Sequence, residues 1–451
     1  MSRERVTILG AGLAGSLLAV YLARRGYEVD VYEARPDMRS TEIPAGRSIN
    51  LALANRGIRA LREVGLYKAV RELVITMRGR MLHAVDGQQA LQPYGKTDDE
   101  VIYSISRGGL NELLLNTAEH QYGVNFHFGH RVMAADLCSG SVRMKESDSG
   151  RQYVLERTPV IAADGAGSIV RRQMSKLPGY SSREDYLEHA YKELEIPAAE
   201  SGGHRIDANA LHIWPRGDYM LIALPNLDGS FTVTLFLARE GEPGFSSLTD
   251  ADAVEAFFRE QFPDALELMP ELATDFFANP TGAMGTIYCQ PWRVGGRFLL
   301  LGDAAHGIVP FHGQGMNCAF EDCFELDQCL ETMGAPGPRG WERVFAEFEE
   351  RRKPNADAIA AMALENYIEM RDTVRDPRFH LKKQLAWELE RRFPEAFVPR
   401  YSLVMFHHVP YAEARRRGVI QQGILDELIG DAASLDHIDY NQAGELIDAR
   451  L

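Results

Sequence analysis

Gly10-Ala11-Gly12-Leu13-Ala14-Gly15 is the stretch of sequence that decides the fold. A short apolar β-type run at residues 6–9 comes directly before it, and residues 13–24 have the composition of a helix. A second β-type run at residues 29–32 then ends at Glu33. Strand, glycine turn, helix and strand within about thirty residues form a βαβ unit, which predicts two parallel strands joined by a right-handed crossover.

The three glycines of this stretch have separate tasks in a dinucleotide site. The first permits the tight turn, the second lets the backbone approach a pyrophosphate, and the third lets helix and strand pack closely. The helix N-terminus then faces the phosphates. An acidic residue about twenty positions on, here Glu33, accepts hydrogen bonds from the adenosine ribose. The unit therefore predicts dinucleotide binding, with candidate contacts Gly10, Gly12, Leu13, Gly15, Glu33, Ala34 and Arg35.

The bulk composition is that of a globular protein of more than one unit. A chain of 451 residues is too long for one ordinary core, so two or three packed units are expected. The formal charge of −15, from 64 acidic and 49 basic residues, gives no electrostatic reason to bind nucleic acid. The five cysteines lack the spacings of redox or zinc motifs, so we expect reduced thiols, no metal and a cytoplasmic protein.

One segment imitates a membrane span. Residues 6–23 carry no charge over eighteen positions, which is nearly the length that crosses a bilayer. The segment holds three glycines within six residues and divides into a β-type and a helical part, so we interpret it as a buried strand followed by a helix. Acidic residues are scattered through 418–451, and we expect no membrane anchor there.

Later segments predict a second domain inserted into the first. The apolar runs at 160–163 and 298–301 suit a parallel sheet that is covered on both faces. Residues 211–214, 219–224 and 231–237 are β-type runs joined by Gly, Asp and Asn turns, which is typical of an antiparallel meander. After about residue 320 the apolar residues recur at helical spacing.

The predicted fold is α/β. A Rossmann-like dinucleotide-binding domain with a parallel sheet is interrupted by an antiparallel β-sheet substrate domain and followed by a C-terminal helical region. The predicted bounds are 1–75, 101–184 and 281–330 for the first domain, 76–100 and 185–280 for the second, and 331–451 for the helical region.

Two later stretches narrow the choice of cofactor. Residues 163–171, Ala-Asp-Gly-Ala-Gly-Ser-Ile-Val-Arg, follow one β-type run, and residues 302–306, Gly-Asp-Ala-Ala-His, follow another, with Pro-Phe-His-Gly-Gln-Gly-Met-Asn at 310–317 close behind. In content, order and separation these resemble the two downstream fingerprints of the flavoprotein aromatic hydroxylases. The resemblance implies that FAD is bound non-covalently, that Asp303 binds its ribityl chain, and that the helix after 310–317 faces the flavin pyrimidine edge.

The resemblance also implies a reductant and an oxidant. The chain has a single GxGxxG, and the resembled family lacks a separate nicotinamide domain, so NADPH would dock transiently over the FAD site near Asp164. The family implies that NADPH reduces FAD and that O₂ then adds at the flavin C4a. The distal oxygen of the resulting hydroperoxide attacks the aromatic substrate.

A narrower resemblance points to the kynurenine-hydroxylating branch of that family. It rests on residues 46–53, 78–81, 91–95, 310–317 and 363–367, and it extends from about residue 6 to about residue 411. It implies that L-kynurenine is hydroxylated ortho to its ring amine, in tryptophan degradation. The implied substrate contacts are Arg80, Tyr94, Asn366 and Tyr401, with Phe311 and His312 near the ring; the implied cofactor contacts are Leu53, Arg107, Asp164, Asp303, Gly315, Met316 and Asn317.

Several alternatives stay open on the residues alone. An arginine in a β-run is usually solvated, and Tyr94 beside Pro93 is equally suited to a turn. Nothing in the sequence makes His306 or His312 a general base. The rival functions are a related hydroxylase of a phenolic acid such as salicylate and a non-oxygenating FAD protein for electron transfer. The oligomeric state, monomer or homodimer, is not decided by any of these patterns.

Overall fold

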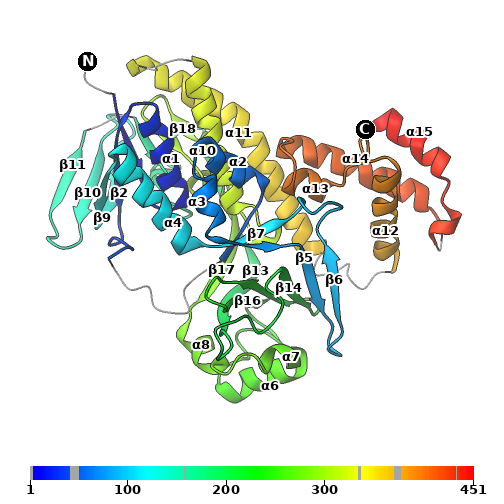
Figure 1. Ribbon diagram of the computed structural model, residues 1–451. Helices are drawn as coiled ribbons and strands as arrows, with labels where there is room; N and C mark the ends of the chain where they lie inside the picture. Colours follow the sequence, from blue (N-terminus) through cyan, green and yellow to red (C-terminus); the bar gives the residue numbers. More distant parts are fainter. Residues whose placement is uncertain (1–3, 41–49, 157–158, 334–336, 370–376, 433) are drawn as a thin grey trace.

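The computed structural model describes residues 4–40, 50–156, 159–333, 337–369, 377–432 and 434–451. Figure 1 shows the N-terminal strands and helices above a second sheet, with the C-terminal helices to one side. Part of one stretch behind the narrower resemblance, residues 46–49, lies outside the described residues.

The glycine-rich turn belongs to a sheet that has six strands within the described ranges. In order across the sheet they are β18 (Arg293–Val294), β19 (Phe298–Leu300), β12 (Val160–Ala162), β1 (Arg5–Leu9), β2 (Glu28–Glu33) and β8 (Asn125–Phe128). The strands from β19 to β8 are parallel, and β18 pairs antiparallel at the edge. The predicted βαβ unit is confirmed, and the two later apolar runs join it as β12 and β19. Because parallel strands end at the same edge, the loops that follow β1, β12 and β19 meet there.

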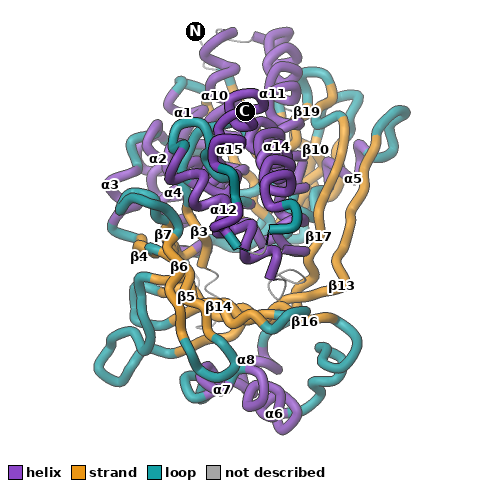
Figure 2. Tube along the Cα trace, turned by 90° about the vertical axis from the view of Figure 1, so that its right-hand side faces the viewer, coloured by secondary structure: helices purple, strands orange, loops and turns teal. Residues whose placement is uncertain are grey.

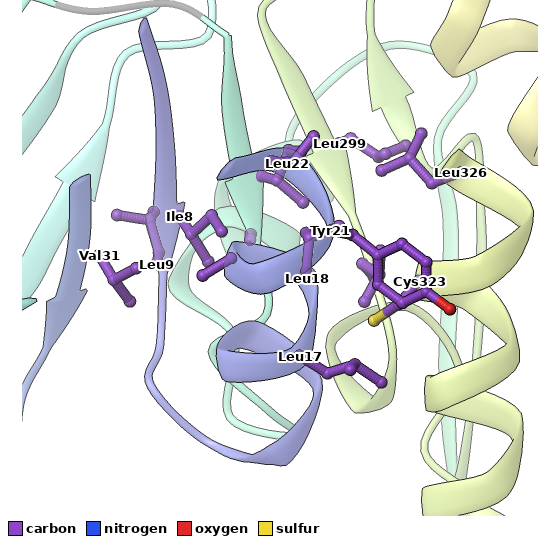
Figure 3. Close-up of a cluster of buried hydrophobic side chains, with 14 of the residues drawn as sticks. Ile8, Leu9, Leu17, Leu18, Tyr21, Leu22, Val31, Leu299, Cys323 and Leu326 are labelled. Atoms are coloured by element: carbon purple, nitrogen blue, oxygen red, sulfur yellow. The ribbon is translucent and has the colours of Figure 1, made fainter. Parts of the chain in front are cut away.

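Helix α1 (Leu13–Arg24) packs between this sheet and α10 (Gly315–Met333) (Figure 3). The hydroxyl of Tyr21 donates to the carbonyl of Ala60, 2.7 Å away, and so joins α1 to α2 (Asn55–Glu63). The buried side chains in this contact include Ile8, Leu9, Leu17, Leu18, Leu22, Val31, Leu299 and Leu326. The uncharged N-terminal run is therefore a buried strand and helix, as predicted. Across the part of the chain that the structure describes, no helix combines the length and apolarity needed to cross a bilayer.

Smaller elements surround this core. The described residues form two further sheets of three strands each: β11 (Gln152–Leu155), β10 (Val142–Glu146) and β9 (His130–Ala135), and β3 (Asn50–Leu53), β7 (Ile102–Ser106) and β4 (Val74–Met77). The additional helices are α3 (Tyr67–Arg71), α4 (Arg107–Asn116), the π-helix η1 (Thr117–Gln121), α5 (Ile169–Met174), α9 (Asp303–His306) and the 3₁₀-helix η2 (Pro310–His312).

The second large sheet has seven strands among the described residues. They are, in order, β17 (Thr281–Gln290), β13 (Ser181–Ile196), β16 (Phe231–Ala238), β15 (Met220–Pro225), β14 (Ala210–Pro215), β5 (Gly79–His83) and β6 (Gln89–Pro93). The predicted meander is present as β14, β15 and β16, which pair antiparallel. The sheet is not antiparallel throughout, because β5 runs parallel to β14. The 76–100 segment reaches the sheet from a distant part of the chain, and sequence pattern alone does not set its direction.

The two faces of this sheet have different neighbours. Helices α6 (Ala251–Gln261), α7 (Pro263–Leu266) and α8 (Leu272–Ala278) cover one face (Figure 2). On that face His83 of β5 lies 2.8 Å from a carboxylate oxygen of Asp264 and 2.8 Å from His212 of β14. The indole of Trp214 donates to the same carboxylate at 2.9 Å. This buried network fixes β5 against β14 and α7, and alternation leaves Arg80 of β5 on the opposite face.

The C-terminal region is helical, as predicted. Its elements are α11 (Gly337–Ile368), α12 (Pro377–Arg392), α13 (Arg400–Met405), α14 (Tyr411–Ile429), the 3₁₀-helix η4 (Leu435–His437) and α15 (Tyr440–Arg450). Helices α12, α14 and α15 share a small apolar core of their own around Leu385, Ile424 and Ile447. Helix α13 instead packs with α11 and β4 in a cluster that contains Leu403, Ile359 and Met77. This placement brings α13 to the space between the two large sheets.

Candidate functional site

A cavity of about 1030 Å³ has walls from both large sheets. That volume is at the upper end of the range for ordinary ligand sites. The cavity starts at the edge where the parallel strands end and continues to the seven-stranded sheet and α13. The predicted site residues that line it are Gly10, Gly12, Leu13, Glu33, Ala34, Arg35, Arg80, Tyr94, Arg107, Asp164, Asp303, Phe311, His312, Gly315, Met316 and Tyr401.

The three glycines of the first turn are needed for different reasons. Gly10 has φ +98°, and a Cβ there would lie 2.5 Å from the carbonyl oxygen of Ala163. A Cβ on Gly15 would lie 2.0 Å from the carbonyl oxygen of Gly10. A Cβ on Gly12 would meet nothing within 4 Å. The protein itself therefore requires the first and third glycines, whereas the second leaves open space toward the cavity.

Glu33 places an ionised acceptor at the end of β2. Its carboxylate accepts from the backbone N–H of Ala11 at 2.9 Å and from the backbone and side chain of Arg35 at 3.0 and 2.8 Å. Although burial opposes ionisation, these partners lower the pKa of Glu33 below its ordinary value. A carboxylate fixed in this way suits hydrogen bonds from ribose hydroxyls.

Two aspartates follow the neighbouring parallel strands. One carboxylate oxygen of Asp164 accepts from the backbone N–H of Ile169 at 3.0 Å, and the other is buried without a partner among the described residues. Burial raises the pKa of Asp164. Asp303 begins α9 directly after Gly302, whose φ of +61° favours glycine. Both aspartates line the cavity, and a buried acceptor without a partner indicates a place for a ligand.

Two helix N-termini also point to an anionic or electron-rich ligand. No side chain caps the N-terminus of α1 at Gly12, and α10 begins at Gly315 on the wall of the same cavity. Free backbone N–H groups and the helix dipole stabilise negative charge at such positions. The residues present therefore fit a dinucleotide cofactor such as FAD.

At the other end of the cavity a cation lies between two phenols. The guanidinium carbon of Arg80 is 4.8 Å from the ring centroid of Tyr401 and 5.6 Å from that of Tyr94. The hairpin of β5 and β6 pairs Arg80 with Gln92, which brings Tyr94 beside it. No carboxylate of the described residues lies within ion-pair distance of Arg80. An unpaired guanidinium on a cavity wall suits a carboxylate ligand.

The phenol of Tyr94 can donate a hydrogen bond to a ligand. Burial raises the pKa of Tyr94 well above its ordinary value, so its hydroxyl keeps its proton. The oxygen of that hydroxyl is buried and meets no described group in hydrogen-bond geometry. The two phenol rings stack with centroids 6.2 Å apart. A ligand carboxylate at Arg80 would satisfy the hydroxyl as well as the cation.

Phe311 and His312 lie on η2, on the wall of the cavity that Asp303 and Tyr401 also line. Burial lowers the pKa of His312 to about 4, so the ring is neutral near pH 7. Its Nδ1 is buried without a described partner, and the ring stacks on Tyr401 with centroids 5.6 Å apart. Phe311 packs against Phe236 of β16 at 5.1 Å. These contacts make a flat, apolar wall and present no charged base.

Four predicted residues do not line the cavity. Gly15 packs α1 against the turn, and Leu53 is buried in the core of the first sheet. The amide of Asn317 accepts from the backbone N–H of Ala54 at 2.9 Å and donates to the carbonyl oxygen of Ala52 at 2.8 Å. Asn366 of α11 donates to the carbonyl of Phe311 at 2.6 Å. Asn317 and Asn366 thus position the loops that form the walls.

Other wall residues were missed from the sequence. They include alternate members of β14, β15 and β16, and parts of β9, β13 and β17: Leu211, Ile213, Met220, Ile222, Leu224, Thr234, Phe236, His130, Arg131, Tyr191, Glu193 and Met284. The intervening residues, such as Trp214, Leu221 and Leu235, face α6 to α8. Period-two alternation in the sequence indicates which residues of a strand share one face of the sheet. It does not indicate which of the two faces lies against the ligand.

Comparisons with known proteins agree with this geometry. Residues 3–363 match the model of a family described as an FAD binding domain. A kynurenine 3-monooxygenase of Myxococcus xanthus (strain DK1622) is 49% identical over 449 residues, which cover 100% of this chain and 96% of the relative. A kynurenine 3-monooxygenase of Stenotrophomonas maltophilia (strain K279a) is 48% identical over 446 residues, covering 99% and 97%.

Solved structures share the fold at low identity. The tetrameric form of 2-methyl-3-hydroxypyridine-5-carboxylic acid oxygenase aligns with a TM-score of 0.66 at 21% identity, covering 84% of this chain and 95% of that one. PqsL of Pseudomonas aeruginosa, in complex with 2-aminobenzoylacetate, aligns with a TM-score of 0.66 at 20% identity, covering 82% and 97%. The α/β architecture with an inserted sheet is therefore shared with these two structures.

The glycine geometry yields a matched pair of variants. Gly12→Ala is expected to keep the thermal stability of the FAD-free protein within about 2 °C of wild type, because nothing in the protein contacts the new methyl. It should weaken FAD binding about tenfold or more, because the methyl occupies the approach of the pyrophosphate. Gly15→Ala should instead lower the stability of the FAD-free protein. Thermal unfolding and FAD titration separate the two, and equal loss of stability in both variants contradicts the assignment.

Proposed function

Because the chain belongs to the kynurenine 3-monooxygenase family of FAD-binding proteins, we propose that it hydroxylates L-kynurenine ortho to its ring amine. One atom of O₂ enters the ring, the other leaves as water, and NADPH supplies the two electrons. The product is 3-hydroxykynurenine, in the degradation of tryptophan.

The observation that carries the proposal is that Arg80 lines the same cavity as the predicted FAD contacts and has no carboxylate partner among the described residues. Kynurenine has a carboxylate at one end and an aromatic amine at the other. A carboxylate at Arg80 receives hydrogen bonds from a guanidinium and from the Tyr94 hydroxyl, which otherwise lacks a described partner. The aromatic end then extends along the cavity toward Phe311 and His312.

The side chains act by binding, orienting and excluding water. FAD, when bound and reduced, supplies the activation of O₂ and the transfer of one oxygen atom. Met220, Ile222 and Phe236 give the cavity an apolar wall that keeps water from the reacting ring. The ring amine of the substrate already donates electrons to the ortho carbon, so no strong protein base is required. The neutral state of His312 agrees with this requirement.

NADPH as the reductant, its docking near Asp164, the state of monomer or homodimer and the cytoplasmic location all stay predictions. A hydroxylase of a phenolic acid would use the same fold and the same Arg80. The relatives that are 48–49% identical are named kynurenine 3-monooxygenases, which favours kynurenine over a phenolic acid such as salicylate.

Turnover tests the proposed function directly. The purified holoenzyme should show a flavin spectrum and should consume O₂ and NADPH when L-kynurenine is added, with one 3-hydroxykynurenine formed for each NADPH. Salicylate, added at the same concentration, is the control and should not stimulate NADPH oxidation. Stimulation by salicylate without stimulation by kynurenine would overturn the substrate assignment. A protein that binds no FAD would overturn the reaction.

Arg80→Ala tests the carboxylate contact. A charge-assisted hydrogen bond is worth about 1.5–3 kcal/mol, so the kynurenine requirement should rise by roughly 10- to 150-fold while FAD remains bound. Arg78→Ala is the matched control, because Arg78 is exposed two residues earlier and does not line the cavity. Steady-state kinetics with oxygen consumption measures both. An unchanged kynurenine requirement in Arg80→Ala would contradict the role of Arg80.

A further inference from the structure

A connected series of buried charged side chains lies outside the cavity. It links the turn that presents Asp303 with the helix that carries Tyr401, and both line the cavity. Asp322 of α10 lies at the centre, with a side chain that is 0% exposed. One of its oxygens accepts from the backbone N–H of Gly302 at 3.0 Å and lies 2.6 Å from His306 Nε2. The other accepts from Arg352 Nε at 2.7 Å. The carboxylate therefore holds the turn between β19 and α9, which presents Asp303 to the cavity.

The chain continues from Arg352 of α11 to the C-terminal helices. Arg352 Nη1 lies 2.7 Å from one oxygen of Glu321, and Arg56 Nη1 lies 2.6 Å from the other. Arg56, also 0% exposed at its side chain, donates to the carbonyls of Val404 and Val409 on either side of the end of α13. Its guanidinium lies 3.9 Å from the ring centroid of Tyr411. This end of the chain holds the helix that carries Tyr401 and Met405 to the substrate wall.

Each charged group in this network contacts at least one group of opposite charge directly. Although burial disfavours the charged ring, Asp322 holds the pKa of His306 well above its ordinary value. Burial also opposes ionisation of Asp322, but His306 and Arg352 lower its pKa. Two carboxylates thus face two guanidinium groups and an imidazolium. Removing one partner leaves a buried charge uncompensated, so the geometry of the chain is strongly fixed.

His306, Cys318 and Asp322 are residue types that also bind metals, and their ligand atoms lie within 4.8 Å of one another. A guanidinium already occupies the group, because Arg352 Nη2 is 3.4 Å from the sulfur of Cys318 and Arg352 Nε is bound to Asp322. A second cation there would be repelled. The cluster is therefore held together by hydrogen bonds of Asp322 with His306 and Arg352.

We propose that the chain Gly302–Asp322–Arg352–Glu321–Arg56–Val404 is a positioning network with two separate ends. Its Asp322 end fixes the turn for the flavin ribityl chain, and its Arg56 end fixes α13 for the substrate. None of its side chains lines the cavity, so each acts through a neighbour. The inference rests on the proposed function, because that function assigns the cofactor to one end and kynurenine to the other.

The shape of the turn explains why its N–H must be held. Gly302 has φ +61° and ψ −140°, a conformation open essentially to glycine alone. Such a turn has few internal restraints, and Asp322 supplies one directly at its N–H. If that hydrogen bond is lost, Asp303 and the start of α9 change direction relative to β19. We therefore expect the loss of the Asp322 carboxylate to weaken the binding of FAD more than the binding of kynurenine.

The experiment compares two variants in the purified holoenzyme, Asp322→Asn, which keeps the side-chain shape, and Arg56→Lys, which keeps the charge. Asp322→Asn should speed the release of FAD, seen as a rise in flavin fluorescence on dilution, by about tenfold or more. Its kynurenine requirement, measured with saturating FAD, should stay within about threefold of wild type. Arg56→Lys keeps the charge and loses the two-carbonyl fork. It should raise the kynurenine requirement about tenfold, with FAD release within about threefold of wild type.

Asp327→Asn is the matched control on the same helix. Asp327 is paired with Arg25, with Nη2 and a carboxylate oxygen 3.0 Å apart, and it touches neither end of the network. It should leave FAD release and the kynurenine requirement as in wild type. If Asp322→Asn and Arg56→Lys change both readouts equally, or change neither, the network has no separate ends and the inference is overturned.

If one of these variants does not fold, Arg352→Lys takes its place. Because Arg352 lies between the two ends, this variant should change both FAD release and the kynurenine requirement. No change in either quantity overturns the inference. Failure of the proposed function is distinguishable, because it appears as wild-type protein that neither holds FAD nor responds to kynurenine.

Discussion

The contact between α1 and the neighbouring strand ends leaves no room for a side chain. A methyl on Gly15 would lie 2.0 Å from the carbonyl oxygen of Gly10, and one on Gly10 would lie 2.5 Å from the carbonyl oxygen of Ala163. This close approach directs the N-terminus of α1 along the edge where the parallel strands end. The loops that carry Asp164 and Asp303 arrive at the same edge, and so three segments far apart in the chain form one wall of the cavity.

The seven-stranded sheet forms a second wall of the same cavity. Alternation along β14 to β16 gives one face to α6, α7 and α8 and the other to the cavity. On the cavity face β14 and β15 present apolar side chains such as Ile213, Met220 and Ile222. The hairpin of β5 and β6 places the guanidinium of Arg80 beside two phenols. One cavity therefore combines groups suited to a dinucleotide with a cation suited to a carboxylate.

Features encoded within a short stretch of sequence were predicted, whereas contacts between distant segments were not. The βαβ unit, the strands before Asp164 and Asp303, and the meander each carry their signal within about thirty residues, so they are readable without the fold. The parallel pairing of β5 with β14 joins segments more than a hundred residues apart and has no such signal. The same holds for Asp322, Arg352 and Arg56, whose helical positions look like ordinary surface charges until the helices pack. Asn317 and Asn366 are assigned to ligands by the resemblance alone, and the structure adds the backbone contacts that hold their side chains.

The central claim is that FAD and kynurenine share one cavity, and the flavin absorption spectrum tests it most directly. L-Kynurenine, added to the oxidised holoenzyme without NADPH, should perturb that spectrum in a saturable way. The same molecule without its carboxylate should bind much more weakly, because it offers nothing to Arg80. If calorimetry shows that kynurenine binds while the flavin spectrum stays unchanged, the two ligands occupy separate sites and the account is wrong.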